Sequence, residues 1–129
     1  MNRIPKDPER EERIDMEVIV DAYDAEERFM GWYYYLQETI DYSDEPIRAR
    51  CSVERIISPL MVGDEVDVLE MAPMDECQGE MFVVIRWGLP GGREKLGVPL
   101  SQLVFLSGDE AARQAEEDWR YWVGRGYQF

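Results

Sequence analysis

The 129-residue sequence has no histidine and only two cysteines, Cys51 and Cys77. Without histidine the chain lacks the usual general base, the usual Ser or Cys triads and the commonest transition-metal ligand. Two cysteines are too few for a disulfide framework or a four-thiolate zinc site. No apolar run approaches the roughly 20 residues that cross a bilayer, and no signal-peptide pattern opens the chain. We therefore expect a soluble, cytoplasmic protein with reduced thiols.

Basic residues are scarce: 14 Lys and Arg stand against 28 Asp and Glu, for a net charge of -14. This balance excludes ordinary phosphate-driven nucleic-acid binding and an anionic membrane surface as partners. The imbalance is local, because residues 16–80 hold seventeen acidic and four basic residues, whereas residues 81–129 hold six of each. Either this half carries a solvated acidic face that keeps the protein soluble, or it presents a surface for cations.

Hydrophobic residues make up 45% of the chain and aromatic residues 12%, which predicts a packed core in a single domain. Residues 1–13 are polar and contain two prolines, so we expect a flexible charged tail or a short charged first turn there, and one domain over residues 14–129. Val18 to Val20 form a short run typical of a β-strand.

Two amphipathic helices are predicted. Asp24 followed by Glu27 is a capping-box pattern, and an apolar stripe follows it at helical spacing, which predicts a helix over residues 24–40. Asp109 can cap a second helix over residues 109–124. About five short strands fall between residues 47 and 106, with a hairpin connection at 88–95. This order predicts an α+β fold, with a small SH3-like β-barrel packed against the two helices.

Two acidic loops are the candidate metal-binding segments. Calcium takes about 6–8 oxygen ligands, mainly carboxylates and carbonyls, and loops supply both. The first loop follows the helix over 24–40 and the second precedes the strand at 81–87; their acidic residues are Glu38, Asp41, Asp44 and Glu45, and Asp75, Glu76 and Glu80. No EF-hand pattern is present. The plain alternative is that both loops are merely exposed and polar.

Catalysis has weak support, and we expect no enzymatic activity. A carboxylate pair could serve glycoside hydrolysis, but a small barrel of this length offers little cleft for a sugar chain. Cys77 lies among acidic residues, which raise the pKa of a thiol and make it a poor nucleophile.

Several long segments together resemble a known family, the small acidic calcium-binding proteins typified by cyanobacterial CcbP. The similarity extends from about residue 11 to the end of the chain. The segments that carry it are MGWYYYL (30–36), ISPLMVGDEVDVL (57–69), MAPMDECQGEMFVVIRW (71–87), GVPLSQL (97–103) and EDWRYWVGRGYQF (117–129). Two stretches depart from the family pattern: residues 41–46 are longer, with Glu45-Pro46-Ile47 replacing a Phe-Pro-Phe-like stretch, and the connection at 88–95 is extended.

The resemblance implies a non-EF-hand protein of the cytosol that binds Ca²⁺, lowers its free level and takes part in calcium signalling. It also implies calcium ligands near the end of the first helix and in the MDECQGEM loop, namely Glu38, Asp41, Asp75, Glu76 and Glu80. We expect a monomer with calcium ions as its ligands. The alternative from another class is an SH3-like interaction module that docks a basic protein through its acidic face, without a metal. An acidic decoy of nucleic acid is a third possibility.

Overall fold

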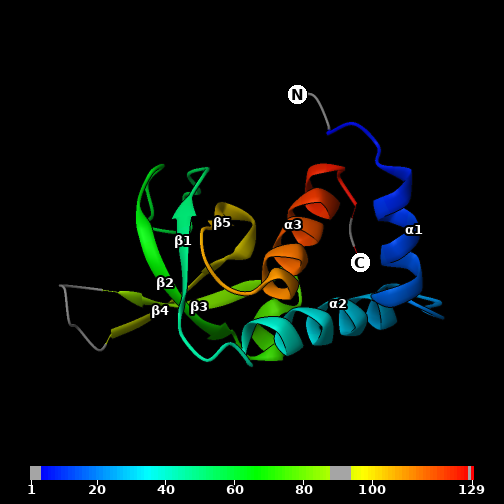
Figure 1. The fold of residues 1–129 in the computed structure, drawn as a ribbon, viewed down its shortest axis with the longest axis horizontal. Coiled ribbons are helices and arrows are strands. Elements are labelled where there is room, and N and C mark those ends of the chain that lie inside the picture. The colour runs from blue at the N-terminus through cyan, green and yellow to red at the C-terminus, as the bar shows by residue number, and fades with distance from the viewer. Residues whose placement is uncertain (1–3, 88–93, 128) are drawn as a thin grey trace.

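The computed structural model describes residues 4–87, 94–127 and 129. This part of the chain forms three α-helices, five strands and two short 3₁₀ helices (Figure 1). In chain order they are α1 (Pro8–Glu17), α2 (Ala25–Ile40), β1 (Ile47–Cys51), β2 (Glu65–Met71), η1 (Met74–Cys77), β3 (Phe82–Trp87), β4 (Glu94–Pro99), η2 (Leu100–Gln102), β5 (Leu103–Phe105) and α3 (Glu110–Gly124).

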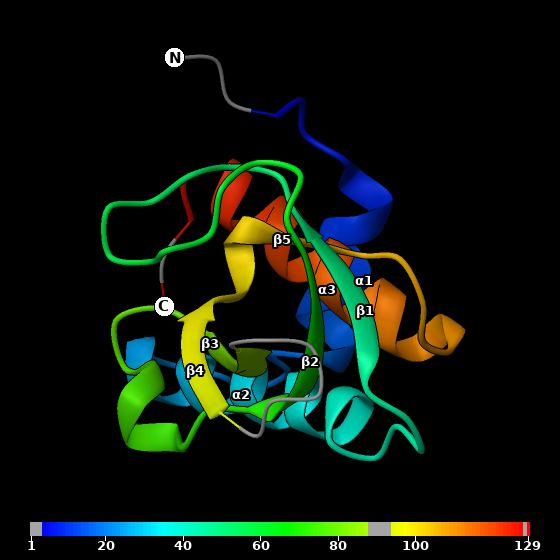
Figure 2. The same ribbon diagram turned by 90° about the vertical axis from the view of Figure 1, so that its left-hand side faces the viewer.

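The strands form one antiparallel sheet in the order β4-β3-β2-β1-β5. Side chains alternate between the two faces, so Ile47, Ala49 and Cys51 of β1 are buried while Arg48 and Arg50 face solvent. The sheet is strongly curved (Figure 2). The predicted α+β class is confirmed. A closed barrel is not, because the edge strands β4 and β5 do not pair within the described residues, where the three-residue β5 is hydrogen-bonded to β1.

The helices lie at one end of the sheet, with α3 between the sheet and α1 in Figure 1. The predicted stripe on α2 is its buried face, and its central residue Trp32 is fully buried. The ring centroids of Trp32 lie 5.2 Å from Trp119 and 5.5 Å from Trp122, both on α3. Burial of such large aromatic rings holds the two helices together. Asp24 and Asp109 cap α2 and α3, as the sequence predicts.

The first helix, α1, corrects two predictions. Residues 1–13 were expected to be a flexible tail, but α1 begins at Pro8 and is capped by Asp7, whose carboxylate accepts from the N–H of Arg10. Val18 to Val20 were expected to be a strand, but they form the turn after α1, where Val18 is its C-cap residue. The described chain therefore has three helices where two were predicted.

The first strand, β1, ends at Cys51, and a loop that is hydrogen-bonded to the rest of the chain follows it. The connection predicted at 88–95 lies mostly in residues 88–93, outside the described residues, although β3 and β4 pair antiparallel on either side of it. Among the described helices, none combines the length and apolar character needed to cross a membrane.

Candidate metal centre

Asp41 lies where the C-terminal end of α2 meets the end of β2. As the C-cap residue of α2, it directs one carboxylate oxygen to the backbone N–H of Met71 at 2.8 Å. Ala72 follows directly after β2, and its carbonyl accepts a hydrogen bond from the hydroxyl of Tyr33 at 2.7 Å. Asp41 is exposed at its surface, but the protein around it removes part of its hydration, which raises the pKa of the carboxyl, and the nearby negative charge of Glu70 raises it further. Asp41 is thus a carboxylate fixed in a negative environment.

Asp75 and Glu76 are exposed on η1, which follows β2 directly. Burial raises the pKa of the Tyr33 hydroxyl, and the negative charges of neighbouring groups, Asp41 and Asp75 among them, raise it further. The hydrogen bonds from the Met71 N–H to Asp41 and from the Tyr33 hydroxyl to the Ala72 carbonyl place the end of α2 beside the residues that lead into η1. We call this region, made of Asp41, Glu70 and Asp75 around Tyr33, the acidic junction.

Glu38 lies exposed on α2, close in sequence to Asp41. In the described part of the chain, Glu38, Asp41, Asp75 and Glu76 form no salt bridge with Lys or Arg. Four of the five predicted ligands therefore carry charge that no basic side chain balances, which is the state that favours cation binding.

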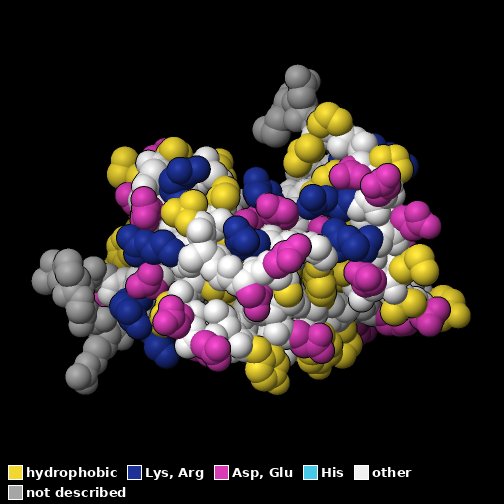
Figure 3. Space-filling view, in the orientation of Figure 1, with side chains coloured by type: hydrophobic (Ala, Val, Ile, Leu, Met, Phe, Trp, Pro, Cys, Tyr) yellow, Lys and Arg dark blue, Asp and Glu magenta, His cyan; other side chains and the backbone are white. Residues whose placement is uncertain are grey.

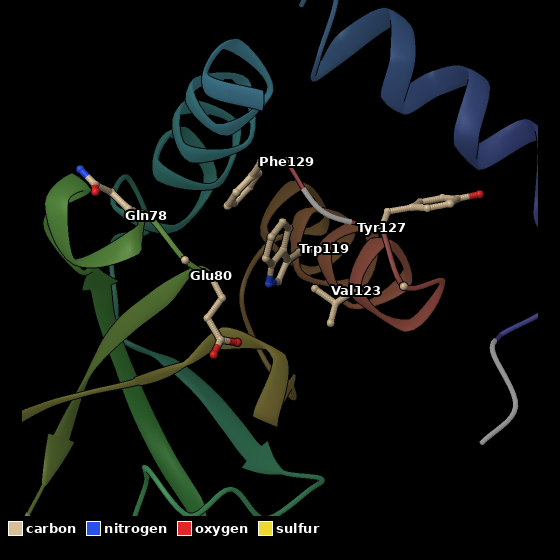
Figure 4. Close-up of a pocket in the computed structure, with 8 residues that line it drawn as sticks. Gln78, Glu80, Trp119, Val123, Tyr127 and Phe129 are labelled. Carbon is tan, nitrogen blue, oxygen red and sulfur yellow. The ribbon is translucent and has the colours of Figure 1, made fainter. Parts of the chain in front are cut away.

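Glu80, the fifth predicted ligand, has a different environment. Its two carboxylate oxygens accept from the two terminal guanidinium nitrogens of Arg55, at 2.7 and 3.0 Å. This bidentate pair neutralises Glu80 and directs it away from Gln78, as Figure 4 shows. Sequence reasoning treated Glu80 as a free ligand, and the structure shows it bound to a cation that the chain itself supplies.

A cavity of about 540 Å³ lies beside Glu80. It is lined by residues 78–80 and by the end of α3 and the residues that follow it, including Trp119 and Phe129 (Figure 4). The indole N–H of Trp119 is buried and has no hydrogen-bond partner among the described residues. The cavity thus offers one neutralised carboxylate and aromatic rings. This set does not fit a hard cation, which needs several oxygen ligands.

The five predicted carboxylates do not form one coordination shell. Within the described residues, no three Asp, Glu or Cys side chains lie close enough together to hold a metal ion. The acidic junction contains ligands of the right chemistry for a hard cation, since carboxylate and carbonyl oxygens are what calcium prefers. In the described structure, the acidic junction does not bring these ligands close enough together to coordinate an ion.

Two features of the acidic surface were missed by the sequence reasoning. Glu70, which raises the pKa of Asp41, was read only as part of a strand; its outward position at the end of the alternating run VDVLEM is the signal that could have found it. A hollow of about 390 Å³ also lies between residues 42–46 and 107–109. It brings Asp109, considered only as a helix cap, near Asp44 and Glu45.

The charges of the sheet and of α2 differ sharply. The outward acidic residues of β2 pair with basic residues of neighbouring strands, as Asp67 does with Arg48 at 3.2 Å and Arg86 at 3.5 Å, so both signs alternate over the sheet (Figure 3). Residues 21–45 contain eight acidic residues and one basic residue, and the structure shows no salt bridge for any of them. The unbalanced charge of the described chain is thus concentrated around α2, Asp41 and Asp75, whereas Glu70 pairs with Lys95 at 3.9 Å.

The chain matches known proteins in both sequence and fold. A family model described as calcium binding, that of CcbP, matches residues 12–123. The chain belongs to the CcbP family of calcium-binding proteins. The crystal structure of Anabaena CcbP is 37% identical to it with a TM-score of 0.81, and the match covers 100% of both chains. A calcium binding protein in the calcium-binding form is also 37% identical, with a TM-score of 0.79 over 96% of both chains. No curated protein sequence matches the chain.

Proposed function

We propose that this protein binds Ca²⁺. The observation that carries the proposal is the match, over 96% of both chains and at 37% identity, to a structure described as a calcium binding protein in the calcium-binding form. The charge distribution supports it independently, because segment 21–45 has eight acidic residues against one basic residue, and none of them forms a salt bridge with the described residues. A divalent cation at this surface relieves the repulsion between carboxylates.

The acidic junction is the region where we place the ion. Asp41 would be the central ligand, because the Met71 N–H fixes its carboxylate where the end of α2 meets the end of β2. Asp75, Glu76 and Glu38 lie on the two elements that meet there. Glu80 can join only if its pair with Arg55 opens. The ion supplies positive charge, and the chain supplies oxygen ligands at the meeting point of α2, β2 and η1.

We further propose a non-EF-hand protein that buffers cytoplasmic calcium as a monomer, within calcium signalling, and that performs no catalysis. The absence of an EF-hand pattern in the sequence supports the first point. Burial raises the pKa of both thiols, Cys51 and Cys77, so neither is a reactive nucleophile at neutral pH. With no histidine in the sequence, the chain also lacks the usual general base.

A calorimetric titration with CaCl₂ after treatment with chelator tests the proposal. We expect heat of binding and a rise in the melting temperature, since a ligand at 100 times its Kd adds about 2.7 kcal/mol to the free energy of unfolding. Mg²⁺ should bind more weakly, because it keeps its waters and requires a rigid octahedral geometry. No heat and no thermal shift at millimolar calcium would refute calcium binding.

The position of the ion is tested with Asp41→Asn, which keeps the size of the side chain and an oxygen for the Met71 N–H. Asp15→Asn is the matched control, since Asp15 is exposed on α1, away from the acidic junction. We expect Asp41→Asn to weaken calcium binding well beyond the control, and the difference should persist at high salt, which screens surface charge. Equal small losses in both variants would place the ion elsewhere.

A further inference from the structure

The loop between β1 and β2 presents large apolar side chains to solvent. Residues 53–62 form most of this loop, and Ile56, Ile57, Met61 and Val62 each expose more than 60% of their surface, with Ile56 fully exposed. Hydrophobic side chains gather at this end of the molecule in Figure 3, over the loop at the upper left. Scattered exposed apolar residues are common, but several on one short loop indicate an interaction surface.

The loop is ordered by contacts with the body of the protein. Leu60 is buried beneath it. The side-chain amide of Gln102 donates to the carbonyl of Val53 at 3.0 Å, and Arg55 is held by Glu80. The exposed apolar side chains of the loop therefore face solvent, while the Val53 carbonyl and the side chains of Arg55 and Leu60 hold the loop against the protein. A surface held in place before binding loses little conformational entropy when a partner docks.

Charge decides what kind of partner fits. Residues 53–65 contain three acidic residues and one basic residue; Arg55 pairs with Glu80 and Glu65 pairs with Arg48, which leaves Glu54 and Asp64 without a salt bridge in the described part of the chain. The whole chain carries -14, so a second copy would be repelled, while a cationic partner would be attracted.

We propose that the β1–β2 loop docks a cationic amphipathic segment of another protein, with Ile56, Ile57, Met61 and Val62 contacting its apolar face. The acidic residues beside the loop attract the lysines and arginines of that segment. This surface lies outside the acidic junction and does not rest on calcium binding.

The test uses a fluorescent peptide of leucine and lysine at helical spacing, titrated with the full chain in the presence of chelator and followed by anisotropy. The variant Ile56→Ser/Ile57→Ser removes the apolar contact at exposed positions. Its matched control, Met16→Ser/Val20→Ser, removes two exposed apolar side chains from the α1 end of the molecule. We expect the loop variant to weaken binding roughly 10-fold to 100-fold, from the apolar area that two isoleucines bury, and the control to stay within about 2-fold.

Three results would overturn the proposal. First, the peptide could fail to bind. Second, both double variants could lose the same affinity, which would show that the peptide is only attracted to an acidic protein in general. Sedimentation could instead show that the wild-type chain forms a dimer that Ile56→Ser/Ile57→Ser abolishes, which would make a second copy the occupant. Thermal unfolding of the variants shows whether a loss comes from the surface or from misfolding. Since the titration contains no calcium, failure here leaves the calcium proposal standing, and the reverse also holds.

Discussion

Removing the carboxylate of Asp118 should release helix α1 from the rest of the protein. Asp118 lies on α3 with a fully buried side chain and accepts from Arg13 at 2.6 and 2.8 Å and from Arg10 at 3.2 Å. The hydroxyl of Tyr35 on α2 donates to it at 2.8 Å. One carboxylate therefore joins all three helices. It also holds the pKa of the Arg13 guanidinium well above its usual value, mainly through the hydrogen bond between them.

The size of the effect follows from what Asp118→Ala leaves behind. Removing one partner of a buried ion pair costs about 3–5 kcal/mol, because the remaining charge stays buried without compensation. Arg10 and Arg13 each expose 27% of their side chains, so water can reach them and the cost falls at the lower end. We expect Asp118→Ala to lower the free energy of unfolding by about 3 kcal/mol and the melting temperature by roughly 10–15 °C.

Urea unfolding followed by tryptophan fluorescence measures this loss, and limited proteolysis near α1 shows whether the helix has separated. The control is Glu17→Gln, because Glu17 pairs with Arg13 only at 3.9 Å and is 59% exposed. An exposed pair of this kind contributes less than about 1 kcal/mol. If Asp118→Ala proves as mild as the control, the buried carboxylate does not anchor α1 and the reasoning fails.

Two further predictions concern the packing of α2 and the pH dependence of α3. Gly31→Ala should destabilise the protein by about 1–3 kcal/mol in the same urea assay, because a Cβ there would clash with the carbonyl oxygen of Val18; a neutral effect would show that the turn after α1 can move aside. Glu116 is buried, and this burial raises the pKa of its carboxyl, so the folded state favours the neutral form. The neutral carboxyl contributes stability at low pH, and this contribution is lost as pH rises from the ordinary pKa of 4.5 through the raised pKa. The stability of the wild type relative to Glu116→Gln should therefore decrease between pH 4.5 and neutral pH, and a pH-independent difference would contradict this.

Local signals were enough to predict α2 and α3, and long-range contacts explain why α1 was missed. Asp24 and Asp109 each precede an apolar stripe at helical spacing, so the caps and the buried faces could be found within one segment. In α1 the buried hydrophobic residue is Ile14 alone. The position of α1 depends on the contact of Arg13 with Asp118, more than 100 residues away, and no local sequence pattern reveals that contact.

The candidate site was predictable in its chemistry but not in its pairing. The sequence indicates which loops are rich in acidic residues, and the structure joins Asp41 of the first loop, and Tyr33 on the preceding helix, to Met71 and Ala72, just before the second loop. The sequence could not indicate that Arg55, which is remote from Glu80 along the chain, would form an ion pair with the Glu80 carboxylate. Opposite charges choose partners in three dimensions, so a count of acidic residues overstates the number that are free to bind a cation.

The balanced charges of the sheet and the surplus around α2 have a consequence for the behaviour of the whole molecule. A body with one nearly neutral end and one strongly negative side possesses a large electric dipole moment, so it does not present all orientations equally to a charged neighbour. A small cation diffusing nearby is drawn along the field toward the α2 side, and a positively charged chromatographic resin should hold the protein by that same side. The sheet, with its own charges already matched, would then be left facing the surrounding liquid.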